Sequence, residues 1–364
     1  MRGKLVPSCR ACGAVVGDVV LDLGEQPPCD LFPPAADPGP DPVFPLRMWL
    51  CGRCSLAQLV EDPGTAEEPA GVEPRALTEQ AADAVRVLTE AGLVRPGATV
   101  AEHGSPHGGS WLPLLRAAGM REAAPGERAD LVVDCFGLMH EPVQDKAMAE
   151  RAERLAPGGA LVAQFHSLAS ILAQGQWNAL RHGHFAYYSL PAMTALARTA
   201  GLAPCRSWSF PLYGGTVLLE LRPGARPDPE TQRRERAELA AGVTDAATVA
   251  GLGRAAADGA ARLRRELAER ARGGKRVLGY GAASRAIALL NRAGIDHELL
   301  PAIVDISTGK HGRRMPGCRI PITGPATLRG DLPDVVVLFV PDLLSEVRES
   351  FPELKAQDTE WLLA

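Results

Sequence analysis

No apolar run in this 364-residue chain approaches the length needed to cross a bilayer, and the first residues, M-R-G-K-L-V-P-S-C, lack the apolar core of a signal peptide. Aromatic residues make up only 5% of the chain, and no dense basic stripe carries interleaved aromatic side chains. Together with a net charge of −4, this composition excludes the footprint of a nucleic-acid-binding surface. We therefore expect a cytoplasmic protein that binds a small molecule, and neither a nucleic acid nor a membrane.

Two cysteine pairs stand apart in residues 1–62, which we expect to form a separate module. Cys9-Arg-Ala-Cys12 and Cys51-Gly-Arg-Cys54 each place two thiolates on one short turn, so that four sulfurs can surround one tetrahedral Zn²⁺. Cytosolic cysteines stay reduced, which favours zinc over the competing redox-pair and disulfide interpretations. Because four sulfurs fill every coordination position, the zinc is expected to be structural and not catalytic.

A second unit, residues 63–222, opens after a connector rich in proline and glutamate with the run V-A-E-H-G-S-P-H-G-G-S-W from Val100 to Trp111. This run predicts a buried strand, a glycine turn and a helix start, an arrangement that lets a backbone approach an adenosyl or phosphate group. Helices and strands alternate around it as in a doubly wound α/β domain. The elements predicted in this unit are helix 77–91, helix 112–118, strand 129–136, helix 144–155 and strand 160–165.

The spacing also predicts that this α/β domain is truncated. Only about ten residues separate Gly119 from Ala129, which is too few for the two further strand–helix units that such a domain usually inserts there.

A polar and aromatic cluster follows, with His166 and the run Arg181-His-Gly-His-Phe-Ala-Tyr-Tyr-Ser189. Three histidines, His166, His182 and His184, lie within twenty residues, which is denser than an ordinary surface. Packing alternatives stay open, since His182 could line a pocket without reacting. His140 and His297 are expected to be surface or loop residues.

The last unit, residues 223–364, begins with a helical connector and continues as a second α/β domain. Strands are expected at 275–280, 301–305 and 334–340, with a glycine turn, Gly279-Tyr-Gly-Ala-Ala-Ser-Arg285, before a helix at 286–292. The turn is by itself weak evidence of phosphate or nucleotide binding, since such turns also serve tight strand–helix packing. The chain as a whole is thus predicted to be α/β: a zinc-binding module, a truncated Rossmann-like domain and a second Rossmann-like domain.

These runs together resemble the zinc-containing sugar C-methyltransferases, which act on nucleotide-linked ketosugars in antibiotic biosynthesis. The resemblance covers nearly the whole chain. It rests on C-R-x-C-G from Cys9, L-G-E-Q-P from Leu23, C-G-R-C-S-L-A-Q-L from Cys51, G-K-R-V-L-G-Y-G-A-A-S-R from Gly274 and V-D-I-S-T-G-K-H-G-R-R-M-P-G-C-R-I-P-I from Val304.

The resemblance implies a reaction and its residues. S-adenosylmethionine would sit at Glu102, Gly104 and Gly108. A histidine base would remove a proton from the carbon beside the sugar ketone, and the enolate would take the methyl group. The family's Y-H-E-H-F motif aligns with residues 181–185, which makes His184 the base position, and a second active-site histidine aligns with His166.

The chain departs from the family at that motif, where Arg181 and Gly183 replace tyrosine and glutamate. Arg181 would pair with a phosphate or stabilise an enolate. The missing strands would remove the acidic residue that holds the cofactor ribose in the family, and His103, Pro106 and His107 alter the glycine turn. The alternative is therefore an enzyme without S-adenosylmethionine, an epimerase, isomerase or lyase that uses histidine proton transfer; a non-catalytic scaffold is the third interpretation.

Overall fold

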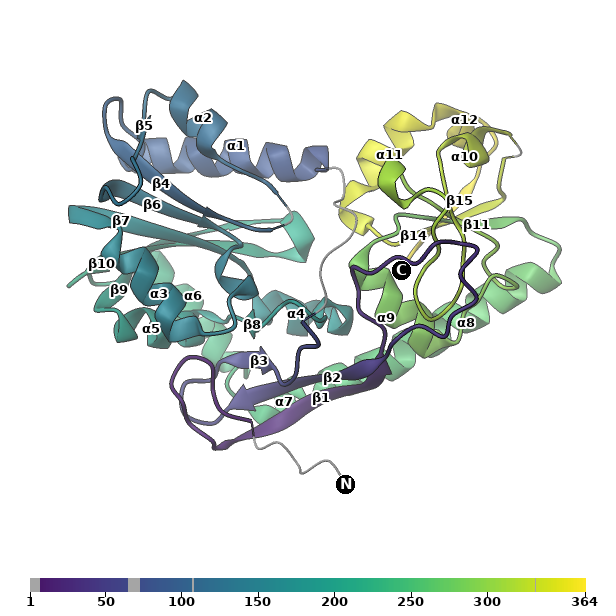
Figure 1. The fold of residues 1–364 in the computed structure, drawn as a ribbon, viewed down its shortest axis with the longest axis horizontal. Helices are drawn as coiled ribbons and strands as arrows, with labels where there is room; N and C mark the ends of the chain where they lie inside the picture. Colours follow the sequence, from purple (N-terminus) through teal and green to yellow (C-terminus); the bar gives the residue numbers. More distant parts are fainter. Residues whose placement is uncertain (1–6, 65–72, 107, 331) are drawn as a thin grey trace.

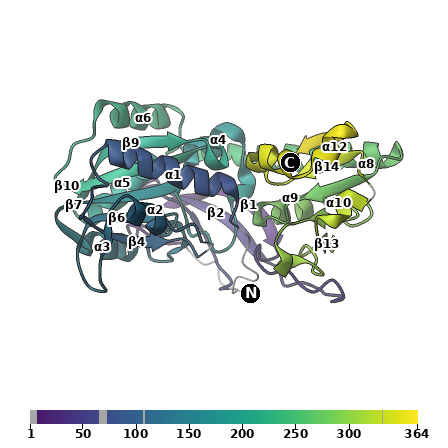
Figure 2. The ribbon, with the colours of Figure 1, turned by 90° about the horizontal axis from the view of Figure 1, so that it is seen from above.

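The computed structural model describes residues 7–64, 73–106, 108–330 and 332–364, so His107 and most of the connector before residue 73 lie outside the described residues. Three sheets, one for each expected unit, organise the chain (Figure 1). Seen from above, the central and C-terminal sheets lie at opposite ends of an elongated molecule (Figure 2).

The N-terminal sheet has the strand order β1-β2-β3-β8 and is antiparallel. Its strands are β1 (Gly17–Gln26), β2 (Phe44–Cys51), β3 (Ala57–Leu59) and β8 (Ala186–Tyr187). Because β8 comes from the histidine-rich segment of the central unit, the module predicted as residues 1–62 is completed by a strand from elsewhere in the chain. The zinc module is thereby joined directly to the segment that carries His184.

The central sheet has the order β5-β4-β6-β7-β10-β9. The first four strands are parallel, and β10 runs antiparallel to both β7 and β9. Helices α1 and α2 cover one face with an apolar core that includes Ala84, Leu88 and Leu115, and α3 and α5 cover the other with one that includes Met148 and Leu196 (Figure 1). The strands and helices are β4 (Thr99–Gly104), β5 (Arg121–Glu122), β6 (Ala129–Cys135), β7 (Leu155–His166), β9 (Leu202–Phe210), β10 (Thr216–Pro223), α1 (Arg75–Glu90), α2 (Leu112–Ala117), α3 (Gln144–Glu153), α4 (Leu168–Gln174) and α5 (Leu190–Thr199).

One detail corrects the sequence analysis, which expected no strand between Gly119 and Ala129. A two-residue strand, β5, is present there and pairs in parallel with Thr99 and Val100 at the start of β4. It ends before the level of Glu102, so the sheet beside the glycine turn is still truncated.

The C-terminal sheet is entirely parallel, with the order β13-β12-β11-β14-β15, as a Rossmann-like unit requires. The helical connector is interrupted near Gly242, since α6 ends at Ala240 and Gly242 takes a φ of +78°. The elements are α6 (Pro229–Ala240), α7 (Ala246–Val249), α8 (Gly251–Arg272), β11 (Val277–Tyr280), α9 (Ser284–Ala293), β12 (Ile303–Val304), β13 (Ile322–Thr323), α10 (Ala326–Gly330), β14 (Val335–Leu338), α11 (Leu344–Ser350), α12 (Pro352–Ala356) and β15 (Glu360–Leu363).

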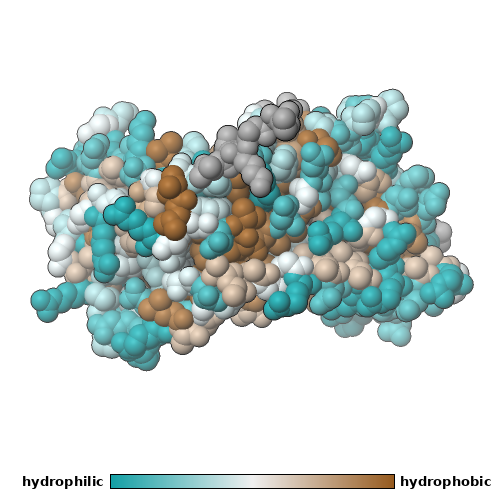
Figure 3. All heavy atoms as spheres, turned by 90° about the horizontal axis from the view of Figure 1, so that it is seen from below, coloured by the Kyte–Doolittle hydropathy of each residue, from teal (hydrophilic) through white to brown (hydrophobic). Residues whose placement is uncertain are grey.

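Within the described ranges, no helix is both long and apolar enough to cross a membrane. On the face seen in Figure 3, hydrophobic side chains gather near the middle, while hydrophilic ones predominate towards the ends.

Candidate functional site

The four cysteines predicted to bind zinc lie together at one end of the N-terminal sheet. Their sulfurs are all within 4.8 Å of one another, with Cys9 Sγ 3.5 Å from Cys54 Sγ and Cys12 Sγ 3.7 Å from Cys51 Sγ. Backbone N–H groups of Ala11 and Arg53 point at two of these sulfurs, a contact that stabilises thiolates. The donor set therefore fits a tetrahedral structural Zn²⁺ held by four sulfurs.

A pocket of about 300 Å³ lies where the three units meet, which is the size of a small ligand site. The N-terminal module contributes Asp30 and Phe32 to its wall, and the C-terminal unit contributes Arg285 and Lys310. The central unit supplies the predicted His166, Arg181 and His184, together with residues of the glycine turn.

Arg181 and His184 are in direct contact in the loop before β8. The Arg181 guanidinium donates from Nε to His184 Nε2 over 2.8 Å, and its Nη2 contacts the same nitrogen. A guanidinium has only donors, so Nε2 of His184 must accept, which requires a neutral imidazole with its proton on Nδ1. Arg181 therefore selects the tautomer of the predicted base.

Two hydrogen bonds from backbone N–H groups hold the same loop in place. The hydroxyl of Tyr187 accepts from the Arg181 N–H at 3.0 Å, and Asp62 of the N-terminal module accepts from the Gly183 N–H at 2.6 Å. Gly183 takes a φ of +81°, which a glutamate would adopt only with strain. The replacement of glutamate by glycine thus fits the local backbone.

His140, expected to be a surface or loop residue, is half-buried in the connection between β6 and α3 and also lines the pocket. Its ring meets that of His184 edge to face, with centroids 4.6 Å apart. Its Nδ1 lies 3.1 Å from the carbonyl oxygen of Gly183 and must donate to it, so in the neutral ring Nε2, 3.5 Å from the Ser105 hydroxyl, is an acceptor. Its position just after β6, at the carboxyl end of a parallel strand, is the signal that could have identified it.

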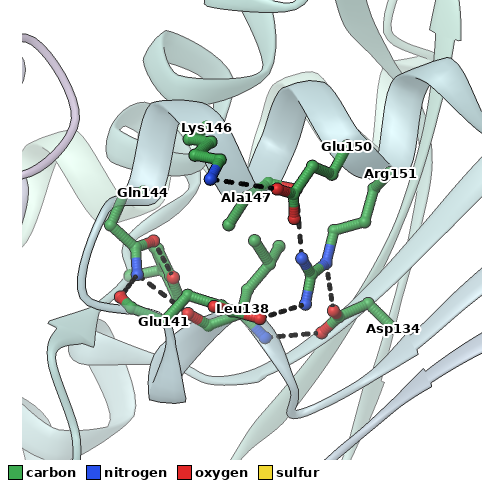
Figure 4. A network of polar contacts seen from close by, with 9 residues as sticks. Asp134, Leu138, Glu141, Gln144, Lys146, Ala147, Glu150 and Arg151 are labelled. Carbon is green, nitrogen blue, oxygen red and sulfur yellow. Dashed lines mark hydrogen bonds and ion pairs between the residues drawn. The ribbon is translucent and has the colours of Figure 1, made fainter.

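A buried polar network holds the turn that presents His140 (Figure 4). Asp134 accepts from the Leu138 N–H at 3.0 Å and from Arg151 Nε at 2.6 Å, and both charged side chains are at most 1% exposed. Gln144 donates to the carbonyl oxygens of Leu138 and Glu141, one on each side of His140. The short helix η1 (Leu138–His140) is therefore fixed from both ends.

His166, the last residue of β7, faces the pocket beside Arg285. Burial, with the charge of Arg285, lowers the pKa of His166 to about 3, so the ring is neutral. Arg285 Nη2 lies 3.5 Å from His166 Nδ1, which must accept, so the proton is on Nε2. That buried Nε2 has no hydrogen-bond partner among the described residues and is free to donate to a ligand.

His182 lies away from the pocket, although the sequence placed it with the catalytic histidines. Its Nε2 contacts the carbonyl oxygen of Pro45 at 3.2 Å, and its ring packs on Phe44 in the N-terminal sheet. Among the predicted catalytic residues, the structure thus brings together His166, Arg181 and His184 but not His182.

The predicted cofactor residues occupy the end of β4 and the turn after it. Gly108 lines the pocket and takes a φ of +94°. Glu102 turns to the start of α2, where its carboxylate accepts from the Trp111 N–H at 2.6 Å and the Ser110 hydroxyl at 2.5 Å. Gly104 does not line the pocket and instead pairs through its backbone with Phe136.

The C-terminal glycine turn meets the pocket at the start of α9. Asp305, at the end of β12, accepts from the Ala282 N–H at 2.8 Å and so closes the turn on itself. Ser284 donates to Asp30 at 2.7 Å, and the Lys310 ammonium lies 4.9 Å above the ring of Phe32. These contacts join the zinc module to the C-terminal unit over the pocket.

Two family models match the ends of the chain: residues 9–67 match a "putative zinc binding domain", and residues 211–364 match a "C-methyltransferase C-terminal domain". The C-methyltransferase NovU of Streptomyces niveus is 27% identical over 400 aligned positions, which cover 94% of this chain and 93% of NovU. Together with the four-cysteine cluster and the α/β architecture, these matches support an enzyme of the methyltransferase family.

Solved methyltransferase structures give weaker likenesses. Magnesium protoporphyrin IX methyltransferase ChlM of Synechocystis PCC 6803, with bound SAH, is 11% identical, and the match covers 41% of this chain and 85% of ChlM with a TM-score of 0.31. Mitomycin 7-O-methyltransferase MmcR is 18% identical, with 41% of this chain and 54% of MmcR covered and a TM-score of 0.32. TM-scores this low establish nothing further about the chain.

Proposed function

We propose that the pocket removes a proton from the carbon beside a ketone of a nucleotide-linked sugar and stabilises the resulting enolate. The observation that carries the proposal is the contact of His140, His184 and Arg181 at the pocket wall. Two neutral imidazoles supply bases that work near neutral pH, and a guanidinium supplies fixed positive charge.

The proton transfer needs an acceptor nitrogen within reach of the substrate. His140 Nε2 is an acceptor in the neutral ring, and His184 Nε2, which accepts from Arg181, becomes available to the substrate when a substrate oxygen takes over the Arg181 donors. Arg181 would then stabilise the enolate oxygen, which carries the charge that develops in the transition state. The unpartnered Nε2–H of His166 is a second donor for that oxygen.

The nucleotide part of the substrate is supported by the cationic side of the pocket. Arg285 and Lys310 line it together with Ser284, the first residue of α9. Guanidinium, ammonium and the N-terminus of a ten-residue helix favour a phosphate group. A nucleoside diphosphate is therefore the chemistry that this wall suits.

Two fates are open to the enolate. The family implies methylation by S-adenosylmethionine in a pathway of secondary metabolism such as antibiotic biosynthesis. The alternative is return of a proton, or loss of a neighbouring group, which would make the chain an epimerase, isomerase or lyase without S-adenosylmethionine. We place either reaction in the cytoplasm, where the zinc thiolates stay reduced.

The test is deuterium exchange on nucleoside-diphosphate ketosugars in D₂O, followed by NMR, with the zinc-loaded full chain. We expect deuterium at one carbon beside the ketone, and His184→Ala should slow its incorporation by ~10²–10⁴-fold, the usual contribution of a general base. Arg272→Lys, at the exposed end of α8, is the matched control and should exchange at the wild-type rate. A lack of exchange on any ketosugar that demonstrably binds would contradict the proposal.

A further inference from the structure

We infer that the glycine turn after β4 does not hold S-adenosylmethionine, and that the enolate is reprotonated, so that the chain is a cofactor-independent epimerase or isomerase. The second part of the inference, reprotonation of the enolate, rests on the proposed function. The first part, that the turn does not hold S-adenosylmethionine, depends only on the turn, the neighbouring sheet edge and the charge of the pocket.

The backbone donors at the turn are already engaged within the chain. The Trp111 N–H donates to Glu102, and the Leu112 N–H lies 3.2 Å from the Ser110 hydroxyl, while Pro113 has no N–H to offer. Two of the donors at the start of helix α2 are therefore engaged, and Pro113 provides none. Glu102, the expected cofactor residue, acts as the cap of this helix, with one oxygen on Trp111 and the other on Ser110.

The turn folds back between Ser105 and Gly108, while Gly104 and Gly108 stay exposed with open space beside them. Gly108 donates to the Ser105 carbonyl oxygen at 3.1 Å, so another inward-facing donor is engaged. A side chain on Gly109 would meet Leu77 at 3.3 Å, which places the first turn of α1 directly over it. Trp111 is only 1% exposed and fills the space behind the turn.

The sheet edge offers no carboxylate for a ribose. In nucleotide-binding α/β folds an acidic residue about twenty positions after the glycine turn, at the end of the next strand, binds the ribose hydroxyls. Here that strand is β5, whose Glu122 pairs at the level of Val100 and forms an ion pair with Arg116. Its carboxylate is exposed and does not line the pocket.

The charge around the histidines also disfavours a sulfonium ion. Neither Arg181 nor Arg285 has an ion pair with any described carboxylate, and each guanidinium approaches a pocket histidine. Burial, with the charge of Arg181, lowers the pKa of Arg285, while the charge of Asp342 acts in the opposite sense. Of the acidic residues of the wall, Asp30 and Asp342 come from the other two units, and Glu73 lies just before α1 in the central unit.

Reprotonation needs no co-reactant. The C–H bond breaks, its electron pair moves into the carbonyl group as the enolate, and the proton moves to an imidazole nitrogen. Return of a proton to the same carbon re-forms the C–H bond and the ketone, and delivery to the opposite face gives the epimer. Atoms and electrons balance within the substrate and the histidines alone.

The first experiment titrates S-adenosylmethionine calorimetrically into the zinc-loaded full chain up to millimolar concentration, with a melting curve of the same sample. We expect no binding heat and no rise in melting temperature. Saturable binding would overturn the inference and leave the proposed enolate chemistry standing.

The second experiment measures exchange in D₂O with and without methyl-labelled S-adenosylmethionine. We expect the same exchange rate in both, accumulation of an isomer and no label in the sugar. Transfer of the labelled methyl group would overturn the inference alone. Absence of exchange in both samples, with a ketosugar that binds, would overturn the isomerase assignment and the proposed function together.

A third measurement tests the structural role of Glu102. Glu102→Gln should lower the melting temperature of the chain without any ligand, because the cap of α2 is weakened. Glu153→Gln, at the exposed end of α3, is the matched control and should leave the melting temperature unchanged. An unchanged melting temperature for E102Q would show that the carboxylate does not serve the helix and would contradict the inference.

Discussion

The rings of His140 and His184 stand nearly perpendicular, at 85°, with their centroids 4.6 Å apart. Each ring is oriented by a different partner, His140 by the Gly183 carbonyl oxygen and His184 by the Arg181 guanidinium. Since Gly183 lies in the loop that carries His184, the two imidazoles are linked through one short segment. They are expected to act as a unit.

The two histidines should therefore give non-additive effects. His140→Ala and His184→Ala are each expected to slow deuterium exchange by ~10²–10⁴-fold, and the double variant should be little slower than the worse single one. NMR-detected exchange on the same ketosugar measures all three rates. Strictly multiplicative losses would show that the rings act independently.

Arg285 should anchor the anionic end of the substrate. Its guanidinium packs 5.1 Å above the ring of Tyr213 while reaching His166, a combination that a lysine cannot reproduce. Arg285→Lys is expected to raise KM by about 10–100-fold with little change in kcat, and Arg272→Lys should change neither. Steady-state exchange kinetics separate the two constants, and a fall confined to kcat would contradict the anchoring role.

Arg151 should be essential to the fold around η1. Its removal leaves the fully buried Asp134 carboxylate unpaired, so Arg151→Met is expected to lower the free energy of unfolding by about 3–5 kcal/mol. Replacing both partners, as in D134N with R151M, should cost less than R151M alone, because no buried charge is left. Urea denaturation of the wild type, both single variants and the double variant gives the coupling. Equal losses for R151M and the double variant would show that the pair is not the cause.

Glu238 should make stability depend on pH. It accepts the Leu190 N–H at 2.6 Å at the start of α5, and burial raises its pKa from 4.5 to about 7. Because the folded pKa is the higher one, its contribution is fully present below pH 4.5 and is lost as pH rises towards 7. The loss amounts to ~3 kcal/mol at most.

The measurement compares urea denaturation of the wild type and Glu238→Gln across that range, and the difference between them should grow steadily with pH. His166 works in the opposite sense, since its pKa is lowered from 6.5 to about 3 and its contribution is lost as pH falls. It is present in both proteins and cancels in the difference. A difference independent of pH would contradict the assignment to Glu238.

Zinc removal should disturb the pocket as well as the module. Cys51 ends β2, and the loop between β1 and β2 carries Asp30 and Asp41 to the C-terminal unit, where Asp41 pairs with Arg314 at 2.6 Å. Cys51→Ser should lose zinc by metal analysis and lower the melting temperature. Cys29→Ser, whose sulfur bonds to Asp30 outside the cluster, should keep its zinc. Full zinc retention by C51S would refute the four-cysteine site.

The sequence predicted the parts of the fold that have strong local patterns. Helix α1, strands β4, β6 and β7, and the four cysteines follow from apolar periodicity, continuous apolar runs and paired CxxC turns. The contact of Arg181 with His184 is close in sequence, three residues apart, and agrees with a role for both in one site.

The parts that could not be predicted depend on distant pairing. Strand β8 is two residues long and exists only because β3 lies beside it, so nothing local marks it. The orientation of His140 depends on the approach of Gly183, 43 residues away. His182 and His184 are two residues apart and would share a face in an extended segment, yet they diverge because Gly183 between them forms a turn with a φ of +81°.

The hydrogen bond from Ser284 to Asp30 joins residues 254 positions apart. During synthesis, the zinc module leaves the ribosome long before the segment that must cover the pocket. The histidines therefore lie in an open cleft until the second Rossmann-like unit has emerged and folded. A fragment of residues 1–250 would contain His184 but lack the C-terminal unit that closes the pocket. Restoring the reaction would require that unit to be added as a separate chain and to bind the fragment.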